Sequence, residues 1–198
     1  MRRMAQLLLL AMAATMAGLA PSRAADRAWP IDEVMGKKDA PITIIEYSSL
    51  TCPHCADFHE KTLPRVKADW IDTGKAKLIL RDFPLDPFAQ AAAMISHCSG
   101  DRYFSFIAAF FHTQAEWVRA ESPLGALEEV AKVGGMEPNQ VEKCLDDRPL
   151  LDEINARKID SEQTYGVNQT PTFIINGKKF AGDMSYEQFA KLLAGRTD

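Results

Sequence analysis

The stretch Thr51-Cys52-Pro53-His54-Cys55 decides the fold, because it joins two segments of different periodicity. Before it, residues 42–47 (ITIIEY) form a nearly continuous apolar run rich in β-branched side chains, which predicts a strand buried on both faces. After it, apolar residues recur at roughly helical spacing, and proline suits the first helical position because that position needs no N–H partner. Two cysteines separated by two residues at such a junction indicate a thiol–disulfide redox site.

The segments on either side extend this junction into an α/β sheet. We expect the helix after Pro53 to kink at Pro64 and to end near Gly74, before a strand at residues 77–81. Strand, helix and strand over this distance are typical of a βαβ unit with parallel strands. Residues 26–40, ahead of the first strand, are polar and predict a loose lead-in.

The end of the chain is expected to return to the sheet. Asn176-Gly177 lies between the apolar runs 172–175 and 178–180, and this pattern is the strongest short-range signal for a β-hairpin. Ser185 and Gln188 then form a capping box, which predicts the start of a last helix.

Between these parts, residues 86–165 show helical patterns only, and the pattern that starts at Pro149 is weak. The block is too long for a single crossover, so we predict a helical subdomain. The residues expected on its apolar faces include Phe88, Ala92, Ile95, Tyr103, Phe106, Ile107, Phe110, Phe111, Leu124, Leu127, Val130 and Val141.

The first 24 residues differ from the rest of the chain. Arg2 and Arg3 precede an apolar run at residues 7–20, and small residues lead up to Ala24. This pattern predicts a secretory signal peptide, residues 1–24, that is cleaved after about Ala24. A membrane anchor is the alternative, but the run is short and Gly18 interrupts it. We therefore expect a protein exported to the periplasm, where its four cysteines would lie in a disulfide-permissive compartment.

The net charge of the chain limits the kinds of partner that it is expected to bind. Without the first 24 residues, 20 basic residues stand against 27 acidic ones, a net charge of −7. An acidic protein of this kind is a poor match for nucleic acid or for an anionic membrane surface, so we expect neither as a partner. The 198 residues suffice for one core with an insertion.

The two cysteines of the motif are expected to have unequal roles. A helix N-terminus offers free N–H groups and the positive end of the macrodipole, which favour a thiolate at Cys52. Cys55, one turn further along, is shielded and ionises less readily. We expect Cys52 to be the exposed sulfur that attacks or is attacked, and Cys55 to resolve the mixed disulfide. A protonated His54 would lower the pKa of Cys52 further, which stabilises the reduced form and favours donation of the disulfide.

Plainer explanations exist for the same residues. One alternative is that Cys52 and Cys55 form half of a zinc site. The chain has no second Cys-x-x-Cys, so we expect no metal. A second alternative is that the two cysteines form a structural disulfide, but closing so short a loop adds little stability. For His54, a solvated surface histidine is the ordinary alternative.

Gln169-Thr170-Pro171-Thr172, just before a predicted strand, is a second candidate element. An X-Pro bond is most often trans. Beside a strand whose edge faces the cysteines, a cis Pro171 is our hypothesis. It would leave the backbone of Thr170 free to pair with an extended substrate.

Cys-Pro-His-Cys after a strand, a helical insertion and Thr-Pro before an Asn-Gly hairpin together resemble the DsbA-like thiol–disulfide oxidoreductases. The resemblance covers nearly the whole exported chain. It implies a thioredoxin fold with an inserted α-helical subdomain: residues 25–85 and 166–198 would form the thioredoxin-like domain, and residues 86–165 the insertion.

The resemblance also implies roles for single residues. Cys52 would be the nucleophile, Cys55 its buried partner, His54 the tuning residue and Pro171 the cis proline. The residues implied to contact substrate are Pro53, His54, Thr170 and Pro171. Threonine before the cis proline also occurs in disulfide isomerases of the same superfamily, so oxidase and isomerase activity both stay open.

Glu46 is out of place in a strand that is otherwise apolar. It lies six residues before Cys52 and matches, by resemblance, the acidic residue that assists proton transfer around the buried cysteine of the family. The alternative is a structural carboxylate that pairs with Lys77 or Arg81.

Cys98 and Cys144 lie on apolar helix faces outside the motif. Buried free cysteines are one possibility. For an exported protein we favour a structural disulfide, as some DsbA-like proteins carry in the helical subdomain, and it would close a loop of 47 residues counted inclusively. Of the three possible pairings, this one leaves Cys52 and Cys55 free to cycle.

These observations predict a periplasmic dithiol oxidase that acts on unfolded or reduced exported proteins. The resemblance implies reoxidation by a DsbB-like, quinone-linked membrane protein, and no cofactor is needed because the cysteines carry the electrons. A reductase or isomerase of the same superfamily and a non-redox chaperone are the alternatives. Residues 25–40 are too few for the dimerisation module of dimeric isomerases, so we expect a monomer.

Overall fold

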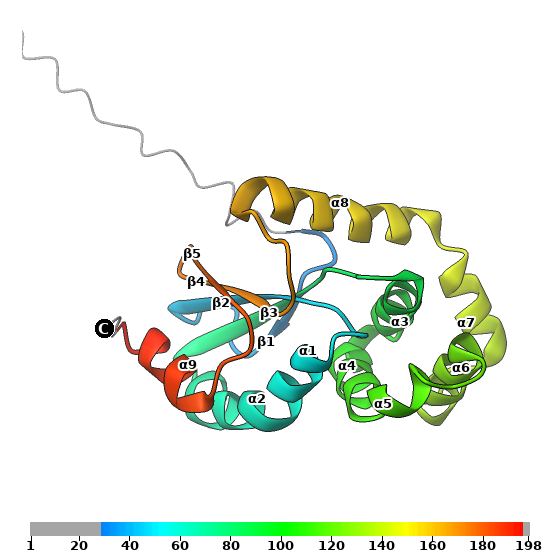
Figure 1. Cartoon of the computed structure of the whole chain (residues 1–198), viewed down its shortest axis with the longest axis horizontal. Helices are drawn as coiled ribbons and strands as arrows, with labels where there is room; N and C mark the ends of the chain where they lie inside the picture. The colour runs from blue at the N-terminus through cyan, green and yellow to red at the C-terminus, as the bar shows by residue number, and fades with distance from the viewer. Residues whose placement is uncertain (1–28, 196–198) are drawn as a thin grey trace, which may run out of the picture.

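A five-stranded sheet with strand order β1-β3-β2-β4-β5 is the centre of the computed structural model, which describes residues 29–195 (Figure 1). The strands are β1 (Glu33–Met35), β2 (Ile42–Ser48), β3 (Ala76–Asp82), β4 (Thr172–Ile175) and β5 (Lys178–Ala181). β2 pairs with β3 in parallel, and the other neighbours are antiparallel. The predicted signal peptide, residues 1–24, lies outside the described residues.

The hydrophobic pattern correctly predicted the central strand. β2 is flanked on both sides by other strands, and its last five residues are buried, because helices cover both faces of the sheet there. The predicted hairpin is also confirmed: β4 pairs with β5 around Asn176-Gly177, where both residues have positive φ values, 47° and 78°. Asparagine and glycine tolerate that conformation best.

The predicted loose lead-in is wrong at one point. Glu33–Met35 form β1, which pairs antiparallel with residues 78–80 of β3 at the edge of the sheet. Three residues are too few to show an alternating pattern, and this strand exists because the edge of β3 offers unpaired backbone groups.

The helix after the motif is interrupted twice. α1 (Pro53–Asp57), a π-helical turn η2 (Phe58–Thr62), α2 (Leu63–Val66) and a second π turn η3 (Lys67–Ile71) follow one another. The predicted C-terminal cap is present, since Gly74 has a φ of 75° and its N–H donates to the carbonyl of Ile71. With α9 (Tyr186–Leu193), these segments cover one face of the sheet, where Phe58, Phe173 and Phe189 form the centre of a buried cluster.

The middle of the chain forms a group of helices at one end of the sheet. The final helix of this group, Arg148–Tyr165, crosses the face of the sheet opposite to the one covered by α1, α2 and α9 (Figure 1). The helices of this group are α3 (Pro87–Cys98), η4 (Gly100–Arg102), α4 (Tyr103–His112), α5 (Gln114–Trp117), α6 (Pro123–Val133), α7 (Pro138–Leu145) and α8 (Arg148–Tyr165). The predicted helical insertion in an α/β fold is therefore confirmed. None of the helices within residues 29–195 combines the length and the apolarity that a bilayer crossing requires.

Two residues were wrongly predicted to lie on apolar helix faces. Phe88 and Leu124 are exposed and do not face the core. The weak helical pattern from Pro149 is confirmed as a helix: it belongs to α8, which has 18 residues and is the longest of the described helices. Its apolar pattern is weak because a buried Arg157, and not another apolar residue, lies at its centre: Arg157 is within 3.5 Å of Asp32 and 3.8 Å of Asp82, and it donates to the carbonyl of Leu80.

A disulfide joins Cys98 at the end of α3 to Cys144 in α7. Cys144 is buried, but Cys98 is exposed, so only one of the two occupies the apolar environment that the sequence predicted for both. The bond ties together two helices whose cysteines are 46 positions apart.

The double variant Cys98→Ala/Cys144→Ala is expected to lower the free energy of unfolding by about 2–4 kcal/mol, because its unfolded chain is no longer constrained by a long loop. Urea denaturation of proteins with Cys52 and Cys55 kept reduced would measure this. A change below about 0.5 kcal/mol would contradict a stabilising role for this disulfide.

Candidate active site

The motif lies where β2 gives way to α1, and the helical insertion holds the connecting loop. Cys52 is the N-cap of α1 and Pro53 occupies the first helical position. The side-chain amide of Gln114, in α5, donates to the carbonyls of Leu50 and Cys52 at 2.8 and 3.0 Å. Thr51 donates to Asp86, the N-cap of α3. The loop is thus fixed by the helices that the insertion contributes.

The surroundings of Cys52 favour its thiolate. Its sulfur receives a hydrogen bond from the Cys55 thiol, and the Thr170 side chain and the backbone N–H groups of Cys55 and His54 add further stabilisation. Burial opposes these effects, but together they lower the pKa of Cys52 to about 5. Cys52 is less exposed than the sequence predicted, since only 6% of the residue is accessible.

Cys55 has the opposite environment. It is fully buried, and burial raises its pKa well above the usual range. Its hydrogen bond to Cys52 and the negative charge of Glu46 raise this pKa further. The two cysteines therefore differ as the sequence predicted: one ionises readily and the other keeps its proton.

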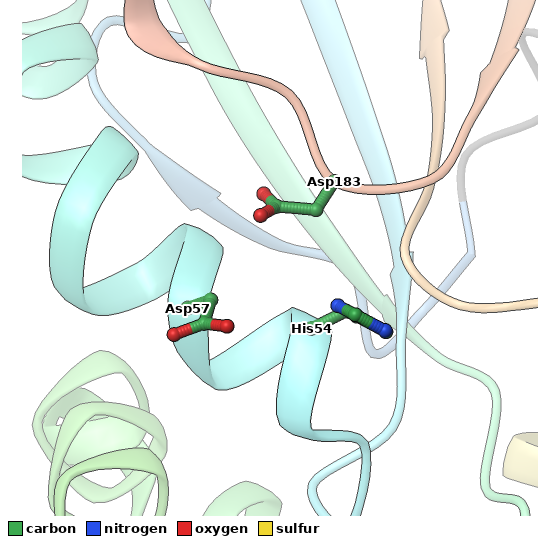
Figure 2. Close-up of side chains that lie close together, drawn as sticks. All are labelled: His54, Asp57 and Asp183. Carbon is green, nitrogen blue, oxygen red and sulfur yellow. The ribbon is translucent and has the colours of Figure 1, made fainter.

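His54 acts on Cys52 through its backbone. Its N–H stabilises the thiolate, whereas its exposed imidazole lies near the carboxylates of Asp57 and Asp183 (Figure 2). No hydrogen bond from the imidazole of His54 to the sulfur of Cys52 is present among the described residues. Asp183 could not be placed here from the sequence pattern, because it comes from the loop after β5, more than 100 residues along the chain.

The ligand atoms of His54, Asp57 and Asp183 lie within 4.8 Å of one another, a spacing at which side chains share a cation. Lys61 already forms an ion pair with Asp57 and supplies positive charge from within the chain. We therefore treat the three residues as an electrostatic cluster at the edge of the motif and not as metal ligands.

Thr170 and Pro171 lie against the motif. The peptide bond between them is cis, and the Cys52 thiol donates to the carbonyl oxygen of Thr170 at 3.3 Å. The Thr170 hydroxyl is buried and has no hydrogen-bond partner among the described residues while Cys52 is a thiol, so it is available to the thiolate. On the other side, Gly182 donates its N–H to the carbonyl of Pro171 at 2.8 Å.

Glu46 is fully buried beneath α1, and its partner is not one of the two cations that the sequence offered. Nε2 of His59 lies 3.1 Å from both carboxylate oxygens of Glu46. Lys77 instead donates to a backbone carbonyl, and Arg81 pairs with Asp32. The predicted alternative of a pair with Lys77 or Arg81 is therefore wrong.

Sequence reasoning missed His59, although a signal for it exists. His59 follows Cys55 by four positions, so one helical turn places both side chains on the same face. That face lies over Glu46 in β2, which is why the buried cysteine, the histidine and the carboxylate come together.

Comparison with known proteins identifies relatives of this chain. A family model described as Thioredoxin matches residues 30–194. A putative protein-disulfide oxidoreductase of Rickettsia bellii is 30% identical over 148 residues, which are 74% of this chain but 57% of the relative. Disulfide bond formation protein D of Bacillus subtilis is 25% identical over 170 residues, covering 81% of this chain and 74% of that protein.

Several solved structures have a fold similar to that of this chain. The crystal structure of alpha-DsbA1 from Wolbachia pipientis superposes with a TM-score of 0.80 at 32% sequence identity, covering 85% of this chain and 92% of the other. BdbD from Bacillus subtilis has a TM-score of 0.74 at 23% identity, covering 84% and 92% of the two chains, and at that identity it supports the fold alone.

Proposed function

This chain belongs to the thioredoxin family and is one of its DsbA-like thiol–disulfide oxidoreductases, and from that premise we propose that it is a dithiol oxidase of exported proteins. Its substrates are reduced or unfolded proteins in the periplasm. The active disulfide is the one between Cys52 and Cys55, and the pair Cys98 and Cys144 serves the scaffold.

The observation that carries the proposal is the contrast between the two cysteines of one motif. A Cys52 with a pKa of about 5 is a thiolate at neutral pH, so the reduced enzyme is stabilised. A stabilised reduced form makes the disulfide a stronger oxidant, because each unit of pKa lowering favours the thiolate by about 1.4 kcal/mol. A fully buried Cys55 is protected from outside thiols, which directs attack to Cys52.

The reaction follows from this contrast. A client thiolate attacks Sγ of Cys52, a client–Cys52 bond forms, the Cys52–Cys55 bond breaks and Cys55 leaves with the electron pair. The second client thiol, as a thiolate, then attacks the client sulfur of the mixed disulfide and releases Cys52 as a thiolate. The client loses two electrons and two protons; the enzyme gains the two electrons and one proton, at Cys55, and the other proton goes to solvent.

The client surface is proposed to include Pro53, His54, Thr170 and Pro171. Pro53 and His54 are exposed beside Cys52, and Thr170 is half-buried on the other side of the sulfur. The exposed apolar side chains of Leu85 and Phe88 flank the loop, since the Leu85 N–H bonds the Ser49 hydroxyl. An extended client segment with apolar residues suits this surface.

Export and reoxidation belong to the same proposal. The signal-like pattern of residues 1–24 and the Cys98–Cys144 disulfide support an oxidising compartment, because cytosolic proteins rarely keep structural disulfides. A DsbB-like, quinone-linked membrane protein would take the two electrons from the reduced enzyme and restore the disulfide.

The reduction potential of the Cys52–Cys55 pair tests the direction of the reaction. Equilibration with glutathione redox buffers is expected to give a value clearly more oxidising than that of thioredoxin, which is about −270 mV. A value close to that of thioredoxin would falsify the oxidase proposal and favour a reductase.

A further inference from the structure

We propose that His59 is a positioning residue for the proton that Cys55 gains and loses, and that it acts through Glu46. The inference rests on the thiol–disulfide exchange proposed above. It concerns the internal step at the buried cysteine, whichever direction the overall reaction takes.

Glu46 lies on a face of β2 that is covered by a helix. Ile44, Glu46 and Ser48 alternate along β2 and therefore share one face of the strand, and Ile44 belongs to the buried cluster that contains Phe58. That face lies under the helix that carries Cys55 and His59. The carboxylate of Glu46 thus lies between the strand and both helical side chains.

Burial makes the histidine necessary. Cys55 and Glu46 have no accessible surface, and water therefore cannot easily stabilise a charge on either. His59 is the one hydrogen-bond partner of Glu46 in the described part of the chain, with Nε2 at 3.1 Å from both oxygens. Removing one partner of such a pair leaves an uncompensated buried charge, which is strongly unfavourable.

Packing fixes the imidazole in this position. The ring of Phe111, in α4, lies 4.2 Å from that of His59 at an interplanar angle of 31°, and Phe58 contacts it edge-on at 5.6 Å. The side chain of His59 keeps 6% of its exposure, whereas Glu46 keeps none. His59 is thus the member of the pair that reaches towards solvent.

Other titratable groups face the same region. Cys52 and Cys55 approach from α1. Burial raises the pKa of Tyr103 in α4, and the negative charge of Glu46 is among the charges that raise it further. His112 and Glu60 form an exposed ion pair at 3.5 Å, next in sequence to Phe111 and His59. Of these groups, Cys52 and Cys55 exchange bonds in the internal step, and only Cys55 gains or loses a proton there.

When the disulfide is reduced, Cys55 leaves as a thiolate and takes one proton from the Glu46–His59 pair, which changes from neutral to a single negative charge. Solvent then returns the proton to the pair through His59. In the reverse direction, Glu46 accepts the proton of Cys55, and the resulting thiolate attacks the mixed disulfide at Cys52 and expels the bound thiol.

The test measures that reverse step alone. Reduced enzyme is mixed with oxidised glutathione and quenched with acid, and the rate at which Cys55 releases glutathione from the Cys52 mixed disulfide is followed from pH 5 to 9. The variant is His59→Gln, which keeps a hydrogen bond to Glu46 but cannot become a cation. His112→Gln is the matched control at the neighbouring exposed histidine.

The expected result is a change in pH profile. Without a cationic partner a buried carboxylate tends to keep its proton, and a protonated Glu46 cannot accept another. Release in His59→Gln should therefore be slower by about tenfold or more at pH 6 and approach the unchanged enzyme towards pH 9. The first step and the thiolate absorbance of Cys52 should not change, and His112→Gln should match the unchanged enzyme throughout.

Two results would overturn the inference: a His59→Gln profile that matches the unchanged enzyme, or slowing by the same factor at every pH, which indicates a structural role. If His59→Gln does not fold, Glu46→Gln/His59→Gln leaves no buried charge and should show the same loss at low pH. A reductase or isomerase would still exchange with glutathione, so the assay stays readable if the oxidase proposal fails. Failure of the unchanged enzyme to exchange at all would instead refute the function.

Discussion

Replacing Cys52 by alanine is expected to lower the rate of client oxidation about 1,000-fold or more, to the level of exchange without enzyme. Cys55 cannot take over, because it is fully buried and its raised pKa keeps it as a thiol at neutral pH. The measurement is the oxidation of a reduced, unfolded test protein in the presence of excess oxidised enzyme, with free thiols counted over time.

Cys55→Ala is the informative partner of this variant. It keeps the ionised Cys52 but lacks the resolving thiol, so exposure to a mixed redox buffer should trap a stable mixed disulfide at Cys52. Client oxidation that persists in Cys52→Ala would contradict the assignment of the nucleophile. Support of client folding by Cys52→Ala at the original level would favour the chaperone alternative.

The reduced enzyme is expected to lose about 2 kcal/mol of its free energy of unfolding when the pH falls from 7 to 5. The pKa of Cys52 is lowered in the folded state from 9.0 to about 5, so the unfolded chain binds more protons at this position between those values. The stabilisation is complete above pH 9 and is lost as the pH falls through 5.

Urea denaturation of the reduced protein at pH 7 and 5 measures this loss, with reduced Cys52→Ala as the reference. Buried ion pairs such as Asp82 with His97 are present in both proteins, so their contribution cancels in the difference. Equal pH dependence in the two proteins would show that the thiolate of Cys52 is not stabilised by folding. A larger loss of free energy of unfolding in Cys52→Ala would show that folding disfavours the thiolate of Cys52.

The sequence predicted those parts of the fold whose causes are local. The β-branched run of β2, the Asn-Gly turn and the capping box at Ser185 each depend on residues that are neighbours in the chain. The redox motif belongs to the same class, because two cysteines one turn apart at the N-terminus of a helix are neighbours in the chain, whereas the contribution of Thr170 to the pKa of Cys52 comes from a distant segment.

The missed features all depend on contacts between distant parts of the chain. β1 exists through its pairing with β3, and the centre of α8 is polar because Arg157 meets Asp32 and Asp82. The partner of Glu46 could not be chosen from the strand sequence, since Lys77 and Arg81 are on the neighbouring strand whereas His59 approaches from the helix above. The helical spacing from Cys55 to His59 was the available clue.

The hydrogen bond from Cys52 to Thr170 joins positions that are 118 residues apart. Closing so long a loop is entropically costly, and chains whose key contacts are this distant fold slowly. A chain made from its N-terminus contains both motif cysteines well before β4 can insert beside β2. The surroundings that separate a reactive sulfur from an inert one are therefore complete only once β4 and the Thr170–Pro171 segment are in place beside the motif.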